Sequence, residues 1–319
     1  MNRYRQFYKE LKQLKYNNNI KNCLFFIYLD LFLSRFIYKL TFNEYVKSGY
    51  KYSRFIKANM MSMRNNRKIM KIFNNANYVH ILENKVDFLK HFANNIKHDW
   101  IYPKEDCLET FLNFAKRNND VIIKPIDSLQ GKGVKKINLN NFSDNELKDI
   151  FKQYQNENIL VEECIVQHPD LVFNNKSVNT IRIFTIMDRN EDVHILKTVL
   201  RVGKGDSVVD NFCAGGVVYP IDKETGIIDG KGIDKDGNTY IYHACSQIQM
   251  IGRKIPYWND VITTAINAAK EIKQIRYIGW DIVVTQNSID IIEANHNPDT
   301  DFLEFIGENA FLPKILKYK

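Results

Sequence analysis

Three residues near the end of the sequence have the types and spacing of a divalent-metal site. Asp281 and Glu293 lie on either side of a turn in the segment IGWDIVVTQNSIDIIEANHNP, residues 278–298, and Asn295 stands two positions beyond Glu293. Residues two apart on a strand share a face of the sheet. Carboxylate and amide oxygens suit Mg²⁺ bridged to substrate phosphates. The spacing therefore predicts a magnesium site on a β-hairpin.

The register of this hairpin sets the two acids against each other. A turn centred on Asn287 places Asp281 directly opposite Glu293. Like charges in that position are destabilising, so the pair needs a compensating cation or one acid must be protonated. Two edge acids that point into solvent remain an alternative, although the apolar residues beside them indicate burial. The same register predicts two further cross-strand pairs, Val283 with Ile291 and Thr285 with Ile289.

A small-residue loop upstream could bind phosphate. Lys124 ends the apolar run VIIK, and Ser128, Gly131, Lys132 and Gly133 follow it. Small residues let backbone N–H groups approach phosphate oxygens closely, and the two lysines add positive charge. The loop is not a Walker A sequence. A plain hairpin turn would have a similar sequence, so the loop alone does not decide the function.

Other charged side chains stand at strand and helix ends. Arg182 lies inside the strand pattern NTIRIF, where an unpaired guanidinium is rarely buried, and Arg201 ends the next strand pattern. Together they could converge on a carboxylate or a phosphate, or each could form a surface ion pair. Lys85 stands at a helix start, where a lysine is ordinarily solvated. Glu162 and Glu163 end the pattern ILVEE and could bind an adenine amino group and ribose hydroxyls.

The elements that must position these residues follow an α+β order. Strand patterns cover residues 120–126, 158–165, 179–188 and 193–203, with the last two expected to be antiparallel. Residues 143–154 begin with a Ser and a Glu three positions later, a capping box. Residues 258–275 form a strongly periodic helix. The pattern predicts a small lobe followed by a larger antiparallel sheet.

Residues 1–75 are helical in pattern and carry no recognisable chemistry. The most apolar part, residues 23–40, is interrupted by Asp30, Arg35 and Lys39. A membrane-spanning helix needs about 20 mostly apolar residues. We therefore predict a buried amphipathic helix there and no transmembrane segment.

Composition limits the class of protein further. The 319 residues carry a net charge of +8, which favours an anionic partner, although Lys- and Asn-rich composition alone could explain it. Five scattered cysteines without a CxxC pair argue for reduced thiols in a cytoplasm and against a zinc site. We expect a cytoplasmic protein that does not bind nucleic acid.

The ordered set of motifs resembles the ATP-grasp superfamily, most closely its sugar-transfer-associated branch. The set runs from Lys85 through IIKP and its Gly loop, VEE, a strand arginine, and LRVG, to GWDIVV and IIEANHNP, and covers roughly residues 78–310. The resemblance implies an ATP-grasp fold of two α+β lobes with antiparallel sheets that grip ATP. It implies a helical extension at 1–77, a small lobe at 78–166 and a large lobe at 167–319.

The resemblance also assigns roles to particular residues. Arg182, Arg201 and Asn211 would lie at the reacting groups, with a turn at 215–216 beside the acceptor. Glu163 departs from the pattern, because many relatives have lysine there. Magnesium, with Mn²⁺ as an alternative ion, would bind Asp281, Glu293 and Asn295. The ATP site would comprise Lys85, Lys124, Ser128, Gln130, Gly131, Lys132, Gly133, Glu162, Glu163 and Ile165.

The implied activity is ATP-dependent ligation of a carboxylate to an amine or amino acid through an acyl-phosphate. The branch suggests a cell-surface polysaccharide or its sugar precursor, such as a uronic acid, as substrate, and polysaccharide-assembly enzymes as partners. Two alternatives stay open. One is an ATP-grasp-type kinase that phosphorylates a hydroxyl, and the other is a nucleotide-binding scaffold that docks such enzymes through its N-terminal helices.

Overall fold

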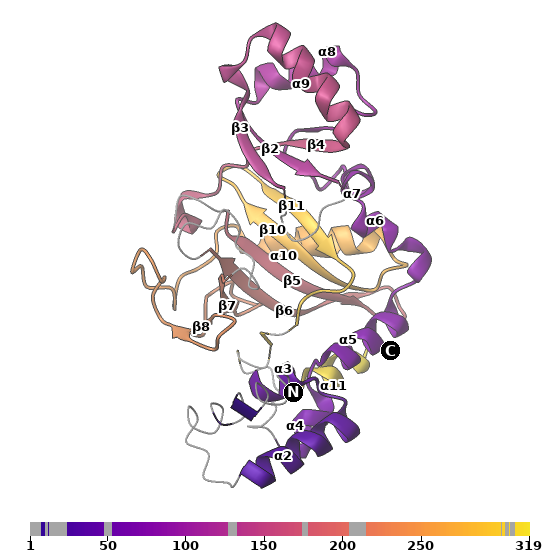
Figure 1. Ribbon diagram of the computed structural model, residues 1–319, viewed down its shortest axis with the longest axis vertical. Coiled ribbons are helices and arrows are strands. Elements are labelled where there is room, and N and C mark those ends of the chain that lie inside the picture. Colours follow the sequence, from indigo (N-terminus) through magenta and orange to yellow (C-terminus); the bar gives the residue numbers. More distant parts are fainter. Residues whose placement is uncertain are drawn as a thin grey trace.

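The computed structural model has three parts along its longest axis (Figure 1). A small α+β lobe lies at one end, a large sheet occupies the middle, and helices of the N-terminal region form the other end. The expected α+β architecture with antiparallel sheets and N-terminal helices is confirmed. The structure describes residues 8–9, 12, 24–47, 53–126, 133–173, 178–203, 215–300, 302–303, 306 and 310–319.

The small lobe is a four-stranded antiparallel sheet with two helices. The strand order is β1 (Trp100–Ile101), β4 (Ile159–Glu163), β2 (Asp120–Pro125), β3 (Lys135–Asn138). Helices α8 (Leu108–Arg117) and α9 (Asp144–Glu157) bury Phe111, Phe114 and Phe151 with the apolar residues of the sheet. The predicted capping box is present, because the Ser143 N–H donates to Glu146 Oε2 at 2.7 Å.

The large lobe is a seven-stranded antiparallel sheet. Its order is β11 (Ile289–Asn295), β10 (Tyr277–Val284), β5 (Thr180–Met187), β6 (Val193–Val202), β7 (Val217–Ile221), β8 (Gly232–Ile233), β9 (Thr239–Tyr240). The predicted antiparallel pairing of β5 with β6 is confirmed. Every residue of β5 and β10 is buried, which explains their long apolar runs.

Helices cover the large sheet on both faces. Helix α10 (Trp258–Glu271) packs with Ile181, Ile183 and Trp280 on one face. Helices α5 (Met63–Phe73) and α11 (Phe311–Leu316) pack with Phe184 and Ile186 on the other. Because side chains alternate along a strand, Arg182 shares a face of the sheet with Phe184 and Ile186, and Asp281 pairs with Arg182 on that face. Helices α5 and α11 pack against this face at Phe184 and Ile186. The candidate site therefore lies on that same face, toward the Arg182 end of β5.

The hairpin of β10 and β11 contains a bulge that sequence arithmetic did not foresee. Asp281 does pair with Glu293, as predicted. The predicted partners of Val283 and Thr285 are wrong, since Val283 pairs with Asp290 and Val284 with Ile289. The turn is one residue shorter than the turn expected for a centre at Asn287, so the pairs next to it are displaced by one position. A register shift between Asp281 and Ile282 then brings Asp281 opposite Glu293.

Three short helices connect the N-terminal region to the lobes: η3 (Ala76–Tyr78), α6 (His80–Glu83) and α7 (Lys85–His91). Leu82, Phe88 and Phe92 belong to the core shared with the large sheet. The division into residues 1–77, 78–166 and 167–319 stays a prediction, and these packing contacts tie the start of its second segment to the large lobe.

The N-terminal region is built from α2 (Leu24–Leu33), η1 (Ser34–Tyr38), α3 (Phe42–Lys47), α4 (Arg54–Asn59) and α5. We predicted that the helix over residues 23–40 would be buried, and this prediction is wrong. In α2 only Ile27 and Leu31 are buried, and large side chains such as Phe25 and Phe36 are exposed. Packing contacts reach one side of α2 and η1, where Ser34 is buried beside Lys57 of α4. Among the described residues, no helix is long and apolar enough to cross a membrane.

Candidate active site between the two lobes

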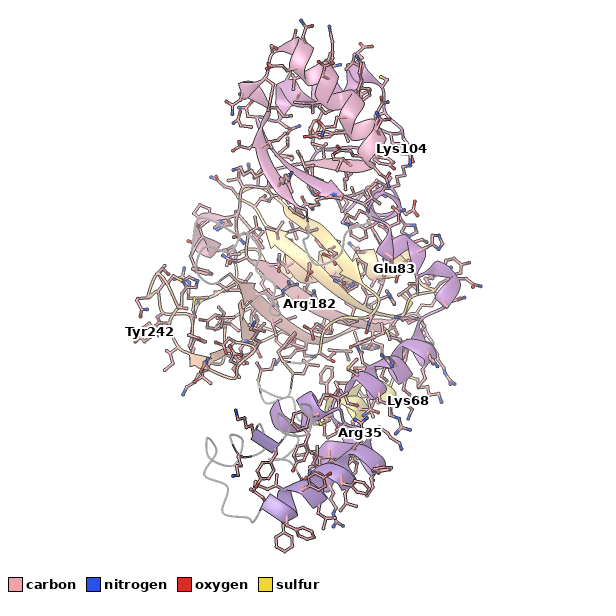
Figure 2. The ribbon with its side chains drawn as sticks, in the orientation of Figure 1. Arg35, Lys68, Glu83, Lys104, Arg182 and Tyr242 are labelled. Carbon is pink, nitrogen blue, oxygen red and sulfur yellow. The ribbon has the colours of Figure 1, made fainter. Side chains whose placement is uncertain are left out.

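The centre of the site is a buried carboxylate held by two arginines. Arg182 Nε and Nη2 donate to Asp281 Oδ1 and Oδ2 at 2.5 and 2.8 Å, and Arg201 Nη1 donates to Oδ2 at 2.9 Å. Arg182, labelled in Figure 2, comes from β5, and Arg201 from neighbouring β6. Burial alone would raise the pKa of Asp281, but the two guanidinium groups lower it below its ordinary value. Asp281 is thus kept ionised.

A glycine makes room for this arrangement. Gly279, two residues before Asp281 on β10, has no side chain beside Arg182. A Cβ at Gly279 would lie 2.5 Å from Pro298 Cβ and 3.3 Å from Arg182 Cδ. The Gly in IGWDI therefore lets the Arg182 side chain run along the sheet to Asp281.

Glu293 lies opposite Asp281, and the negative charge of Asp281 affects its pKa. Desolvation and the negative charge of Asp281 raise the pKa of Glu293, while Arg182, Arg201 and Lys124 oppose that rise. Because the Glu293 side chain is exposed, we attribute the shift mainly to Asp281. The protein's own arginines, Arg182 and Arg201, supply part of the positive charge that the paired acids require.

The oxygen donors here fit a magnesium ion. Asp281, Glu293 and half-buried Asn295 carry two carboxylates and an amide on one face of the hairpin. Mg²⁺ usually takes one or two protein carboxylates and completes its shell with water and phosphate oxygens. Within the described part of the chain, no cluster of three or more His, Cys, Asp or Glu side chains could hold a metal. A magnesium ion here would complete its shell with water and phosphate oxygens beside these side chains.

The two predicted lysines meet at the end of β2. Lys124 forms an ion pair with Glu162 of β4. Lys85, the first residue of α7, donates to the backbone carbonyls of Pro125 and Ile126 at 3.2 and 3.1 Å. Both ammonium groups therefore lie where β2 leads into the predicted phosphate loop. The positive charge of Lys124 acts to lower the pKa of Glu293, and we therefore expect the lysines of the small lobe and the acids of the large lobe to face one another.

Several predicted residues can be placed only in part. Gly133 has a φ of +78°, which favours glycine, and its missing Cβ would contact Pro125. Glu163 accepts from the Asp99 N–H at 2.9 Å, and Ile165 is half-buried next to Val166, which is 78% exposed. Ser128, Gln130, Gly131, Lys132 and Asn211 lie outside the described residues.

A buried charge network joins the lobes, and sequence reasoning missed it. His98 Nδ1 lies 2.8 Å from Asp290 Oδ2 of β11, and its Nε2 lies 3.8 Å from Glu162, the partner of Lys124. The N–H groups of Lys97 and His98 also donate to Asp290 at 2.9 Å. His98 and Asp290 are 192 residues apart, so no local spacing could have indicated the contact. The network fixes the small-lobe Lys124 relative to the large sheet.

The network predicts a pH dependence of stability. Burial alone would lower the pKa of His98, but Asp290 and Glu162 raise it to about 9. The stabilisation of the folded state by protonated His98 is therefore fully present below the ordinary histidine pKa of about 6.5, and it is lost as pH rises through about 9. We expect the free energy of unfolding of wild type to exceed that of His98→Gln by on the order of 3 kcal/mol at pH 6, and the difference to shrink above pH 9. Urea unfolding of both proteins at pH 6 and above pH 9 measures this difference in free energy. A difference that does not change with pH would contradict the charged state assigned to His98.

The two-lobed antiparallel architecture, with lysines at the end of a small-lobe strand and acids on a large-lobe hairpin, is that of an ATP-grasp protein. Within this superfamily, the chain belongs to the sugar-transfer-associated ATP-grasp family, whose family model matches residues 57–318. The match includes every described candidate residue but leaves α2, η1 and α3 outside.

Solved ATP-grasp structures resemble the chain in fold at low sequence identity. The ATP-grasp ligase PsnB, complexed with a phosphomimetic precursor variant, Mg and ADP, shares 13% identity over 77% of this chain, with a TM-score of 0.46. D-alanine–D-alanine ligase from Bacillus anthracis shares 15% over 75% of this chain and 67% of its own, with a TM-score of 0.40. The chain spans 62% of the length of PsnB. No match was found among curated proteins.

Proposed function

We propose that this protein is an ATP- and Mg²⁺-dependent ligase that joins a carboxylate to an amine through an acyl-phosphate. One observation carries the proposal. In a chain of the ATP-grasp family, Arg182 and Arg201 converge on the acid that pairs with Glu293, within electrostatic reach of Lys124. Carboxylate–amine ligation is the general chemistry of ATP-grasp ligases.

The residues supply charge and position rather than a covalent nucleophile. Lys85 and Lys124 would hold the phosphates of ATP, under the loop at 128–133. Asp281, Glu293 and Asn295 would hold Mg²⁺, which would offset the negative charge of the transferring phosphoryl group. Glu162 and His98 keep Lys124 in place. Glu163 and Ile165 would line the base and ribose.

The proposed reaction has two steps. A carboxylate oxygen of the substrate attacks the γ-phosphorus, and the bond to the β-phosphate oxygen breaks to release ADP. The amine nitrogen then attacks the acyl carbon, phosphate leaves, and the nitrogen loses a proton. Arg182 and Arg201 would stabilise negative charge on the acyl-phosphate, since guanidinium groups bind phosphate and carboxylate oxygens well. Asn211 and the turn at 215–216 would lie beside the acceptor.

The name of the family suggests a class of substrate. Because the family is associated with sugar transfer, we propose a uronic acid, in a nucleotide sugar or an oligosaccharide, as the carboxylate, and an amine or amino acid as the acceptor. The product would enter a cell-surface polysaccharide. Working partners would be polysaccharide-assembly enzymes, and the ATP requirement fits the cytoplasm.

A substrate panel tests the proposal. The purified protein is incubated with ATP, Mg²⁺, uronic-acid sugars and a set of amines and amino acids, and ADP, free phosphate and product mass are measured. We expect ADP and phosphate to appear only when a carboxylate and an amine are both present. Phosphate attached to the product would instead identify a kinase. ATP binding without turnover across the panel would identify a scaffold.

Lys124→Met should weaken ATP binding by about 10- to 100-fold. The substitution removes a charge-assisted contact to phosphate worth about 1.5–3 kcal/mol. Lys135→Met is the matched control, because Lys135 is exposed on the adjacent strand β3. Titration with a fluorescent ATP analogue measures both affinities. An unchanged affinity in Lys124→Met would remove Lys124 from the proposed ATP site.

A further inference from the structure

The N-terminal helices carry a large exposed apolar face. Its side chains are 39–66% exposed, whereas a single scattered apolar residue would need no explanation. With each large side chain presenting 150–250 Å² in total, the exposed part amounts to on the order of 900 Å², more than a monomer usually shows. The apolar face consists of Phe25, Phe26, Tyr28, Leu29, Phe32, Leu33, Phe36 and Ile37 from α2 and η1, and Phe55 from α4.

Along α2 and η1 the apolar face is continuous rather than scattered. Phe25, Leu29, Phe32 and Phe36 recur at spacings of three and four, which places them on one side of a helix. The Phe32 and Phe36 rings lie 4.4 Å apart between centroids. The opposite side of the helix, with Ile27 and Leu31, is buried. The helix therefore has one packed side and one wide apolar side that faces solvent.

Basic residues are frequent in the N-terminal helical region that carries the apolar face, and two of its acids are already paired. Asp30 forms an ion pair with Lys57 at 2.6 Å and accepts from the Tyr45 hydroxyl at 2.9 Å. Glu44 accepts from the N–H groups of Thr41 and Met63 at 2.7 and 2.6 Å. Exposed cations lie on η1 and α4, at the end of η1, and on the following helix α5, namely Arg35, Arg54, Lys39, Arg64, Arg67, Lys68 and Lys71.

The net charge is divided unevenly between the N-terminal segment and the rest of the chain. Residues 1–75 contain 16 Lys and Arg but only three Asp and Glu, a net charge of +13. The whole chain has +8, so residues 76–319 carry −5. The modest overall charge thus hides a strongly basic end. Arg35 and Lys68 mark that end in Figure 2, far from Lys104 in the small lobe.

We propose that the apolar face docks in the plane of an anionic lipid bilayer surface. Helix α2 rises only about 15 Å, against a hydrocarbon thickness of about 30 Å, so it would lie in the interface rather than span it. Aromatic and leucine side chains beside Lys and Arg are typical of such interfacial helices, and anionic headgroups would attract the +13 region. A second copy of the chain fits less well, because two such basic regions would repel.

This docking mode leaves the site in water. The small lobe lies at the opposite end of the long axis from α2 in Figure 1, with the large sheet between them. The helices α2 and η1 also precede the segment that matches the family, residues 57–318. These two helices of the proposed bilayer contact lie outside the matched segment, and the proposal does not depend on the proposed reaction.

Vesicle binding by the full chain tests the proposal. Wild type should sediment with vesicles of phosphatidylcholine containing phosphatidylglycerol. Its affinity for vesicles of phosphatidylcholine alone should be lower by about tenfold or more. Phe25→Ser/Phe32→Ser/Phe36→Ser should bind anionic vesicles at least about 100-fold more weakly. Ile241→Ser/Tyr242→Ser is the control, since it removes exposed apolar side chains from the large lobe and should bind as wild type does.

Clear outcomes would overturn the proposal. Absence of binding to anionic vesicles at low ionic strength would do so, as would equal binding by the triple Phe variant. Self-association of wild type that the triple variant abolishes, without vesicle binding, would assign the face to a second copy instead. Thermal melts check that the triple variant is folded. As a second readout, Phe36→Trp should show additional fluorescence that brominated lipids quench, and Trp fluorescence unaffected by those lipids would contradict insertion.

Discussion

Replacing Glu293 by glutamine is expected to reduce ATP turnover by on the order of 10³-fold while leaving the fold intact. The amide keeps the shape of the side chain but removes the charge that a magnesium ion would need. Since the pKa of Glu293 is raised, the ionised acid opposes folding above its ordinary pKa of about 4.3. The melting temperature of Glu293→Gln at pH 7 should therefore equal or slightly exceed that of wild type.

The control for Glu293→Gln is Glu191→Gln. Glu191 is exposed and pairs with Lys273 at the surface, away from the candidate site. Steady-state ADP release and thermal melts of the two variants are compared under the same conditions. Wild-type turnover in Glu293→Gln would contradict the assignment of Glu293 to the metal. A fall in melting temperature would show that Glu293 has a structural role instead.

The largest effect on stability is expected from Asp290→Asn. The substitution keeps the shape but places an NH₂ group or a neutral oxygen against the buried His98 and the N–H groups of residues 97 and 98. Breaking a buried ion pair by neutralising one partner costs about 3–5 kcal/mol. We therefore expect the free energy of unfolding to fall by about 3 kcal/mol or more at pH 6.

Denaturant unfolding of Asp290→Asn is compared with that of Asp236→Asn. Asp236 is exposed on the large lobe, and the same chemical change there should alter the free energy of unfolding by less than about 0.5 kcal/mol. Because the network holds Lys124, Asp290→Asn should also raise the Kd for ATP. Unchanged stability in Asp290→Asn would mean that the lobes do not depend on the network.

The parts of the fold with strong local signals could be predicted from the sequence. The apolar runs of β5 and β10 and the capping box at Ser143 are local patterns, and each reflects burial or backbone hydrogen bonding in its own element. The opposition of Asp281 and Glu293 was also predicted. That prediction assumed a uniform hairpin, whereas the actual alignment depends on a bulge, which no residue spacing reveals.

The contacts between distant segments could not be predicted. His98 and Asp290 each look ordinary in their own segments, and only the meeting of the lobes makes them partners. The sequence predicted that Arg182 and Arg201 could converge on an anion, but not that Asp281 would be that anion. The burial of residues 23–40 was predicted wrongly, because apolar periodicity shows which side of a helix is apolar but not whether another element covers it.

The most direct test of the proposed ligase is to trap its acyl-phosphate with hydroxylamine. The protein is incubated with ATP, Mg²⁺, the uronic-acid panel and hydroxylamine in place of the amine, and products are analysed by mass spectrometry. We expect an ATP-dependent hydroxamate of one panel member, with matching ADP and phosphate, and none in Glu293→Gln. ATP consumption that yields a phosphorylated sugar and no hydroxamate would contradict it.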